Sequence, residues 1–232
     1  MRTNFFLVYM CGGFVLAAIC TARADDILWY NGDLPSSGGG TVNEQASNVG
    51  ASFVYDDFTV TDQAGWIVDR LWSNDAMQIT GISQASWSIR SGMSVGNGGT
   101  IVSSGIGFVT QTPTGRVNPA FDFAEYTIQI SGLNIYLPSG TYWLSVAPLV
   151  GSDSGGLRKS YISATTGANA VGTPPGNDAK SLFYSPWLGY NYKSSFLDDY
   201  SMGVGGSVVP EPSCSLLMAG GVLVLVIRRL RQ

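Results

Sequence analysis

One stretch of the chain, at 125–146, constrains the fold more than any other part of the sequence. In three segments of it, beginning at Tyr126, apolar side chains occupy every second position. A period of two places these side chains on one face of a β-strand. Ser131-Gly132 and Pro138-Ser139-Gly140 separate the segments and have the composition of turns. We therefore expect three consecutive antiparallel strands.

Shorter segments elsewhere have the same strand character, and none has a convincing helical period. One of them, at 85–90, is expected to turn Trp87 and Ile89 inward. Its outward face would carry Ser86, Ser88 and Arg90. Segments rich in Gly, Pro, Ser and Asn at 36–40 and 167–178 predict long surface loops. The other predicted strands lie at 53–60, 65–72, 77–82, 100–104 and 107–112. Together these short strands indicate an all-β fold, an antiparallel β-sandwich of jelly-roll-like type.

The N-terminal segment, at 1–24, has the features of a secretory signal peptide. A basic residue near the start, Arg2, precedes an apolar stretch at 5–20. The small-x-small sequence Ala22-Arg23-Ala24 follows it, so cleavage is expected between Ala24 and Asp25. This segment predicts export of the domain that follows.

The C-terminal segment begins with Pro210-Glu211-Pro212 and continues as an apolar run of 14 residues at 214–227. A helix of that length covers about 21 Å, against roughly 30 Å of hydrocarbon in a bilayer. A basic stop of Arg228, Arg229 and Arg231 follows and would stay on the cytoplasmic side. The run therefore predicts a short transmembrane helix that holds the protein only transiently.

Taken together, motif, apolar run, basic end and terminal position resemble the PEP-CTERM sorting segment of exported proteins of Gram-negative bacteria. The resemblance implies processing by an exosortase, with Pro210, Glu211 and Pro212 as the recognised residues. It also implies passage through the export machinery, a transient stay in the inner membrane, and a final place at the cell surface or in an exopolysaccharide matrix. Segments of the middle region, VYDDFTV and EYTIQISGLNIYLPSGTYWLSV among them, more loosely resemble the β-sandwich modules of such proteins.

These ends divide the chain into a signal peptide at 1–24, a β-sandwich domain at 25–204, a linker at 205–209 and a sorting segment at 210–232. All three cysteines lie in the two terminal segments, so the domain is expected to fold without a disulfide. Between 25 and 209, seven basic residues face fifteen acidic ones, a formal balance of −8. This balance argues against nucleic acid as a partner and offers no basic surface for anionic lipid.

The catalytic inventory of the domain is small. The chain has no histidine, which excludes a Ser/His/Asp triad and a histidine-based zinc site. Carboxylates remain, and a glycosidase needs only a pair of them. Asp56 or Asp57 could form such a pair with Asp122 or Glu125. Adjacent residues of a strand point to opposite faces, however, so Asp56 and Asp57 cannot both serve one site.

Two pairs of neighbouring aspartates are candidates for a calcium site, Asp56 with Asp57 and Asp198 with Asp199. Neither pair has the Asp-x-Asp-x-Asp-Gly spacing of a calcium loop. Solvation or turn capping is the preferred explanation of these aspartates, and no metal or other cofactor is expected.

Four aromatic residues gather in LFYSPWLGYNY, namely Tyr184, Trp187, Tyr190 and Tyr192. Exposed rings can stack on the apolar faces of sugars, and Trp187 and Tyr190 are the candidates for this role. Packing in the core or beneath a long loop is the preferred interpretation of all four. The same interpretation applies more strongly to Trp66, Trp72, Trp87 and Trp143, which lie in predicted strands.

These observations predict an exported, non-enzymatic protein with a structural or adhesive role at the cell surface or in the matrix. Two alternatives remain open: a carbohydrate-binding module, and a carboxylate-dependent glycosidase. Exopolysaccharide is the expected partner of the first alternative and the expected substrate class of the second.

Overall fold

The computed structural model describes residues 26–46, 50–151, 159–194 and 198–210. Outside this part lie the signal peptide with Ala24 and Asp25, the motif residues Glu211 and Pro212, the apolar run at 214–227, and the basic stop of Arg228, Arg229 and Arg231. Within the described residues, no helix is both long enough and apolar enough to cross a bilayer.

Fourteen strands and one 3-10 turn make up the regular structure of the described chain, so the predicted all-β class is confirmed. The first seven strands are β1 (Asp26–Tyr30), β2 (Gly40–Val42), β3 (Glu44–Ala46), β4 (Gly50–Val60), β5 (Trp66–Met77), β6 (Gln84–Ser91) and β7 (Thr100–Asn118). The others are β8 (Phe123–Leu137), β9 (Gly140–Val150), β10 (Ser160–Thr165), β11 (Leu182–Ser185), β12 (Tyr190–Ser194), β13 (Asp199–Tyr200) and β14 (Met202–Val208), with the 3-10 turn η1 (Pro186–Leu188) before β12.

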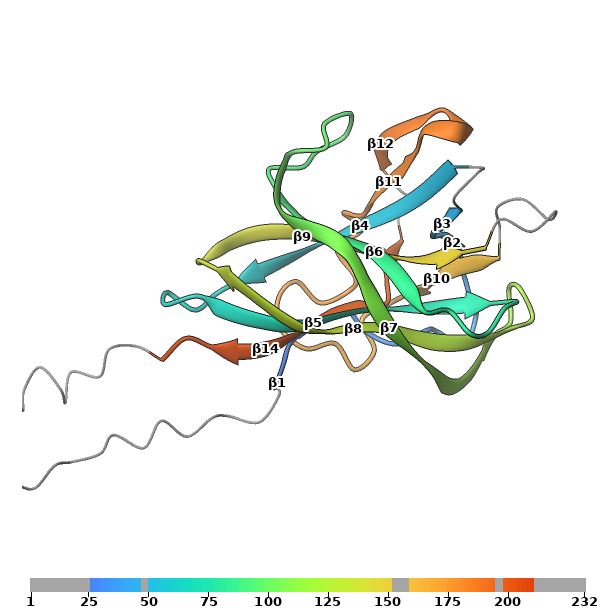
Figure 1. The fold of residues 1–232 in the computed structure, drawn as a ribbon, viewed down its shortest axis with the longest axis horizontal. Helices are drawn as coiled ribbons and strands as arrows, with labels where there is room; N and C mark the ends of the chain where they lie inside the picture. Colours follow the sequence, from blue (N-terminus) through green and yellow to red (C-terminus); the bar gives the residue numbers. More distant parts are fainter. Residues whose placement is uncertain (1–25, 47–49, 152–158, 195–197, 211–232) are drawn as a thin grey trace, which may run out of the picture.

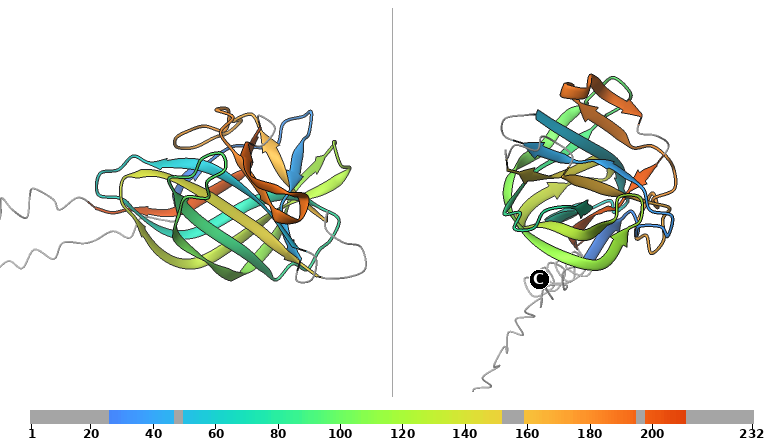
Figure 2. Two further views of the ribbon diagram at one scale, coloured as in Figure 1. Left: turned by 90° about the horizontal axis from the view of Figure 1, so that it is seen from above. Right: turned by 90° about the vertical axis from the view of Figure 1, so that its right-hand side faces the viewer.

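A single strand, β7, joins the two halves of the sheet (Figure 1). Residues 100–108 of β7 pair with β6, and residues 109–118 pair with β8. One half of the sheet follows the order β1-β14-β5-β8, and the other continues through β6 and β9 to β3, β4, β11 and β12. All pairings of the described strands are antiparallel except that of β3 with β9. Figure 2 shows the strands wrapping around a common interior.

The interior is filled by apolar side chains from both halves of the sheet, packed as one cluster. Burial of a large apolar side chain contributes about 1.5–3 kcal/mol to folding. Glycines allow β7 to cross closely over this cluster: Gly105 lies against the ring of Trp87, and a Cβ at Gly107 would come within 2.9 Å of Ile130. The fully buried members of the cluster include Trp29, Phe58, Leu71, Ile89, Ile128, Leu144, Val146, Ile162 and Met202.

The predicted strands at 53–60, 65–72 and 85–90 are confirmed, whereas the predicted turn at Ser131-Gly132 is wrong. Strand β8 continues through these residues as a bulge, where the pairing with β5 shifts between Val68 and Arg70. Gly132 has a φ of +76°, which a bulge and a tight turn both favour, so composition did not separate them. The stretch at 125–146 therefore forms two strands, β8 and β9, rather than three.

Two further strand predictions differ from the structure. The segments at 100–104 and 107–112 belong to one strand, β7. Most of the segment at 77–82 is loop, because the side chain of Gln111 takes the place of a neighbouring strand. It accepts a hydrogen bond from the backbone N–H of Ile82 at 3.1 Å and donates one to the carbonyl of Ile79 at 3.1 Å.

Glycines explain why the segment at 205–209 was expected to be a linker. In the structure β14 includes residues 205–208, all of which pair with β5, and Gly205 and Gly206 also pair with β1. Gly203 and Gly205 lie directly beneath the side chains of Trp72 and Arg70, which leave no space for a Cβ. These glycines serve close packing, and the backbone is held as far as Val209, whose N–H donates to the carbonyl of Gly65 at 2.9 Å.

Candidate functional site

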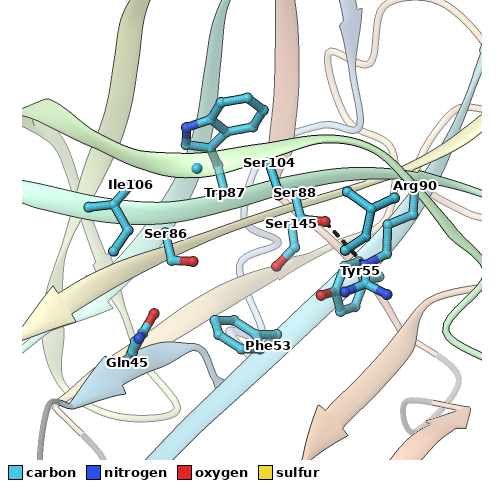
Figure 3. Close-up of a pocket in the computed structure, with 12 residues that line it drawn as sticks. Gln45, Phe53, Tyr55, Ser86, Trp87, Ser88, Arg90, Ser104, Ile106 and Ser145 are labelled. Carbon is cyan, nitrogen blue, oxygen red and sulfur yellow. Dashed lines mark hydrogen bonds between the residues drawn. The ribbon is translucent and has the colours of Figure 1, made fainter.

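A groove of about 350 Å³ lies on the outer face of the half-sheet formed by β4, β9, β6 and β7 (Figure 3). We call it the serine groove, because serines form its floor. Twelve residues line it: Gln45, Phe53, Tyr55, Ser86, Trp87, Ser88, Arg90, Ile101, Ser104, Gly105, Ile106 and Ser145.

Three of the serines form one row across neighbouring strands. Ser88 on β6 lies opposite Ser104 on β7 and opposite Ser145 on β9. The predicted alternation of β6 produces this arrangement, because Trp87 and Ile89 are buried while Ser86 and Ser88 face the groove. Ser145 is only 2% exposed, and its hydroxyl has no hydrogen-bond partner in the described structure. The floor therefore holds a buried polar group whose hydrogen-bonding capacity is unused.

Apolar side chains flank the serine row on both sides. Phe53 and Tyr55 come from β4, and Ile101 and Ile106 come from β7. The two isoleucines are 53% and 58% exposed, so they present apolar surface at the rim of the groove. Burial raises the pKa of Tyr55 to about 12 against the opposing charge of Arg90, so its hydroxyl stays protonated at neutral pH.

An aromatic cluster supports the wall that Phe53 and Tyr55 form. Tyr192 lies between the rings of Tyr184 and Tyr55, at centroid distances of 4.6 Å and 6.0 Å. Phe53 stacks on Tyr184 at 6.4 Å. Buried Met93 and Leu182, together with Trp143, complete the cluster. Two of the four aromatic residues singled out in LFYSPWLGYNY, Tyr184 and Tyr192, therefore pack behind the groove.

The two proposed sugar-stacking residues lie outside the serine groove. Trp187 is 38% exposed and donates from Nε1 to the hydroxyl of Ser52 at 3.0 Å. Tyr190 packs against Phe183 at 5.6 Å, and Lys193 lies over its ring at 5.1 Å.

Asp56 and Asp57 point to opposite sides of β4, as the alternation of a strand requires. Asp56 is buried at the core and accepts hydrogen bonds from Asn31 Nδ2 at 2.8 Å and from the N–H of Tyr200 at 2.7 Å. Burial, with the nearby charge of Asp199, raises the pKa of Asp56 well above its usual range. Its role in the structure is to join β1 and β13 to β4.

Asp57 belongs to a small acidic cluster with Asp178 and Asp199. Burial raises the pKa of Asp57 to about 6, and the charge of Asp178 adds to this effect. Asp199 accepts the backbone N–H groups of Ala179 and Lys180, and the Lys180 ammonium pairs with Asp178 at 2.6 Å. Through these contacts Asp199 attaches the loop before β11 to β13, so the cluster has a structural role.

The remaining calcium candidate, Asp198, contributes a backbone carbonyl that accepts from the hydroxyl of Ser181. Across the described ranges, no group of three acidic, histidine or cysteine side chains has an arrangement that could hold a metal ion. The structure thus brings Asp56, Asp57 and Asp199 near one another but does not form a cation site from them.

The candidates for the second glycosidase carboxylate lie in a different region. Glu125 is fully buried on β8 and pairs with Arg116 Nε at 2.5 Å; Arg116 also pairs with Asp33 at 2.8 Å. Asp122 is exposed in the turn between β7 and β8. Glu125 interacts with Arg116 and Thr114, whereas Asp57 on β4 interacts with Asp178 and Asp199. The two carboxyl groups therefore have different neighbours and do not form a pair.

Comparison of the chain with models of protein families, with curated proteins and with solved structures finds no match. The serine groove is therefore interpreted from its own chemistry. Sequence analysis placed Ser86, Ser88 and Arg90 outward but gave them no role, and it missed Phe53, Tyr55 and Ser145. The sequence pattern that could have indicated a site is the alternation of Ser86, Ser88 and Arg90 on one outward face.

Proposed function

We propose that this protein is an exported, non-enzymatic component of the cell surface or extracellular matrix, and that the serine groove binds a polysaccharide there. The observation that carries the proposal is the row of Ser104, Ser88 and Ser145 between apolar walls, with a buried Ser145 hydroxyl that lacks a partner among the described residues. In this proposal the protein adheres to the matrix by binding its carbohydrate, so the adhesive role and the carbohydrate-binding role are the same.

The chemistry of the groove fits a sugar chain better than an apolar ligand. Sugar hydroxyls need partners that both donate and accept, and a serine hydroxyl does both. The apolar faces of sugar rings need apolar surface, which Phe53, Ile101 and Ile106 provide.

The carboxylates favour binding over hydrolysis. A glycosidase requires two carboxyl groups across one bond, roughly 5–10 Å apart. Arg90 is the only ionisable side chain besides Tyr55 among the twelve lining residues, and Asp56, Asp57 and Glu125 have structural partners elsewhere. A polysaccharide in the groove would therefore be held without being cleaved.

Export and sorting rest on the sequence of the two terminal segments. Asp26 at the start of β1 pairs with Gly206 on β14, so both chain ends leave the domain at the same end (Figure 1). In our proposal the sorting segment beginning at Pro210 is recognised by an exosortase and removed. The domain, which we class as a jelly-roll-like antiparallel sandwich, then reaches the surface or the exopolysaccharide matrix.

Glycan binding is tested on a panel of polysaccharides that includes the exopolysaccharide of the native cells. Wild type is compared with Ser145→Val, which removes the groove hydroxyl, and with Trp187→Ala, which lies outside the groove. We expect binding that Ser145→Val weakens and Trp187→Ala leaves unchanged. Failure to bind any member of the panel would refute the glycan-binding function.

Sorting is tested by the intact mass and the cell fraction of the protein from its native cells. A mature chain that starts at Asp25 and ends within 210–213, outside the inner membrane, is expected. A chain that keeps Arg228, Arg229 and Arg231 in the inner membrane would refute the sorting part of the proposal.

A further inference from the structure

Arg90 is the one permanently charged side chain among the residues that line the serine groove. It forms no salt bridge with any described residue, in contrast to Arg70, Arg116 and Lys180. A guanidinium beside a groove, without an acidic partner, is able to receive an anion from outside the protein.

The hydrogen bonds of Arg90 leave part of the guanidinium unused. Nε donates to the hydroxyl of Ser88 at 3.1 Å. Nη1 donates to the carbonyl of Gly98 at 2.9 Å and to the hydroxyl of Tyr192 at 3.3 Å. The Tyr55 hydroxyl also interacts with the guanidinium through a side-chain hydrogen bond. The bonds to Ser88, Gly98 and Tyr192 use only Nε and Nη1, which leaves at least one N–H of Nη2 for a ligand.

Aromatic rings hold the guanidinium in place. Its carbon lies 5.4 Å from the ring centre of Tyr55 and 5.8 Å from that of Tyr192. These contacts and the bond to Gly98 fix the side chain before any ligand arrives, which lowers the entropy lost on binding. Arg90 follows Ser88 by two residues on the same face, roughly 7 Å along the strand. An anionic group held by Arg90 would thus belong to the sugar on the serine row or to its neighbour.

We propose that the serine groove selects an acidic polysaccharide, whose carboxylate or sulfate is held by Arg90 while the serine row binds the sugar hydroxyls. This inference rests on the proposed glycan-binding function and names its ligand class. The domain has an acidic excess of −8 between 25 and 209, so long-range attraction does not assist binding. Recognition therefore depends on the local contact with Arg90.

The test uses the full-length chain in detergent and matched pairs of polymers. Polygalacturonate is compared with its methyl ester, and dextran sulfate with dextran, so that each pair differs in its anionic groups. Variants are Arg90→Gln, Arg90→Lys, and Arg70→Gln as a control that removes the same charge from the other half of the sheet. Thermal unfolding of each variant reports whether it has folded.

We expect tighter binding of polygalacturonate or dextran sulfate than of its neutral counterpart, and the preferred pair identifies the anion. Arg90→Gln should weaken this binding at least tenfold, Arg90→Lys should keep part of it, and Arg70→Gln should change it less than twofold. Equal binding of charged and neutral polymers, unaffected by Arg90→Gln, would overturn the inference and leave the glycan-binding function standing. If Arg90→Gln does not fold, equal binding of charged and neutral polymers by both wild type and Arg90→Lys would overturn the inference. Binding of none of the four polymers, nor of the native exopolysaccharide, would overturn both.

Discussion

Ser88 and Ser145 lie opposite each other on β6 and β9, yet their hydroxyls differ in their surroundings. Ser88 accepts a hydrogen bond from Arg90, whereas the buried Ser145 hydroxyl has no partner among the described residues. An unsatisfied buried hydroxyl costs stability, and in the proposed function the ligand in the groove supplies the missing partner.

The hydroxyl of Ser145 should contribute to binding and not to stability. We expect Ser145→Ala to change the free energy of unfolding by no more than about 1 kcal/mol, in the stabilising direction, because the mutation removes an unsatisfied polar group. Chemical denaturation measures this effect. The matched change Ser52→Ala should be destabilising, because the Ser52 hydroxyl is bonded to Ser185 and Trp187. A large destabilisation by Ser145→Ala would show that the hydroxyl has a partner within the protein.

The domain should become less stable as pH rises from about 4 to 7. Burial raises the pKa of Asp57 to about 6 and that of Asp75 to about 7, while an unfolded aspartate titrates near 3.9. Between these values the folded state binds more protons than the unfolded state, so the free energy of unfolding falls as pH rises. Denaturation at a series of pH values measures the slope. Asp57→Asn should flatten it near pH 6, and the surface change Asp122→Asn should not. Stability that rises over this window would contradict the burial of these carboxyl groups.

Arg116 should be important for stability because its partner Glu125 is fully buried. Removing it in Arg116→Met leaves a buried carboxylate without its counter-ion, which costs about 3 kcal/mol. Adding Glu125→Gln should recover part of the loss. Lys180→Met, at an exposed ion pair with Asp178, should cost less than about 1 kcal/mol. Equal effects of Arg116→Met and Lys180→Met in urea denaturation would be inconsistent with the buried pair.

The glycines of β14 should be required for packing. A Cβ at Gly203 would meet the ring of Trp72, so Gly203→Ala should destabilise the domain by roughly 1–3 kcal/mol. Gly151→Ala is the control, because no atom of the described residues lies within 4 Å of its added Cβ. If thermal unfolding shows the same midpoint for both variants, residues 203–208 behave as a flexible segment after all.

Sequence reasoning identified the local structure better than the site. The period of two gave the all-β class and the correct outward face of 85–90, because alternation is a local property of a strand. Ser131-Gly132 was misjudged because a glycine with positive φ suits a bulge as well as a turn. The serine groove was not predictable in the same way, since Tyr55 and Ser145 come to lie beside β6 only through long-range pairing of β4, β9 and β6. That pairing leaves no local pattern in the sequence.

The most direct test of the central claim is a calorimetric titration of the full-length chain with an oligosaccharide from the polymer that it binds best. Wild type should bind with a measurable heat, the double variant Ser88→Val with Ser145→Val should lose at least tenfold in affinity, and Trp187→Ala should bind as wild type does. The opposite pattern, with the serine variant unchanged and Trp187→Ala impaired, would place the binding site outside the serine groove and contradict the account.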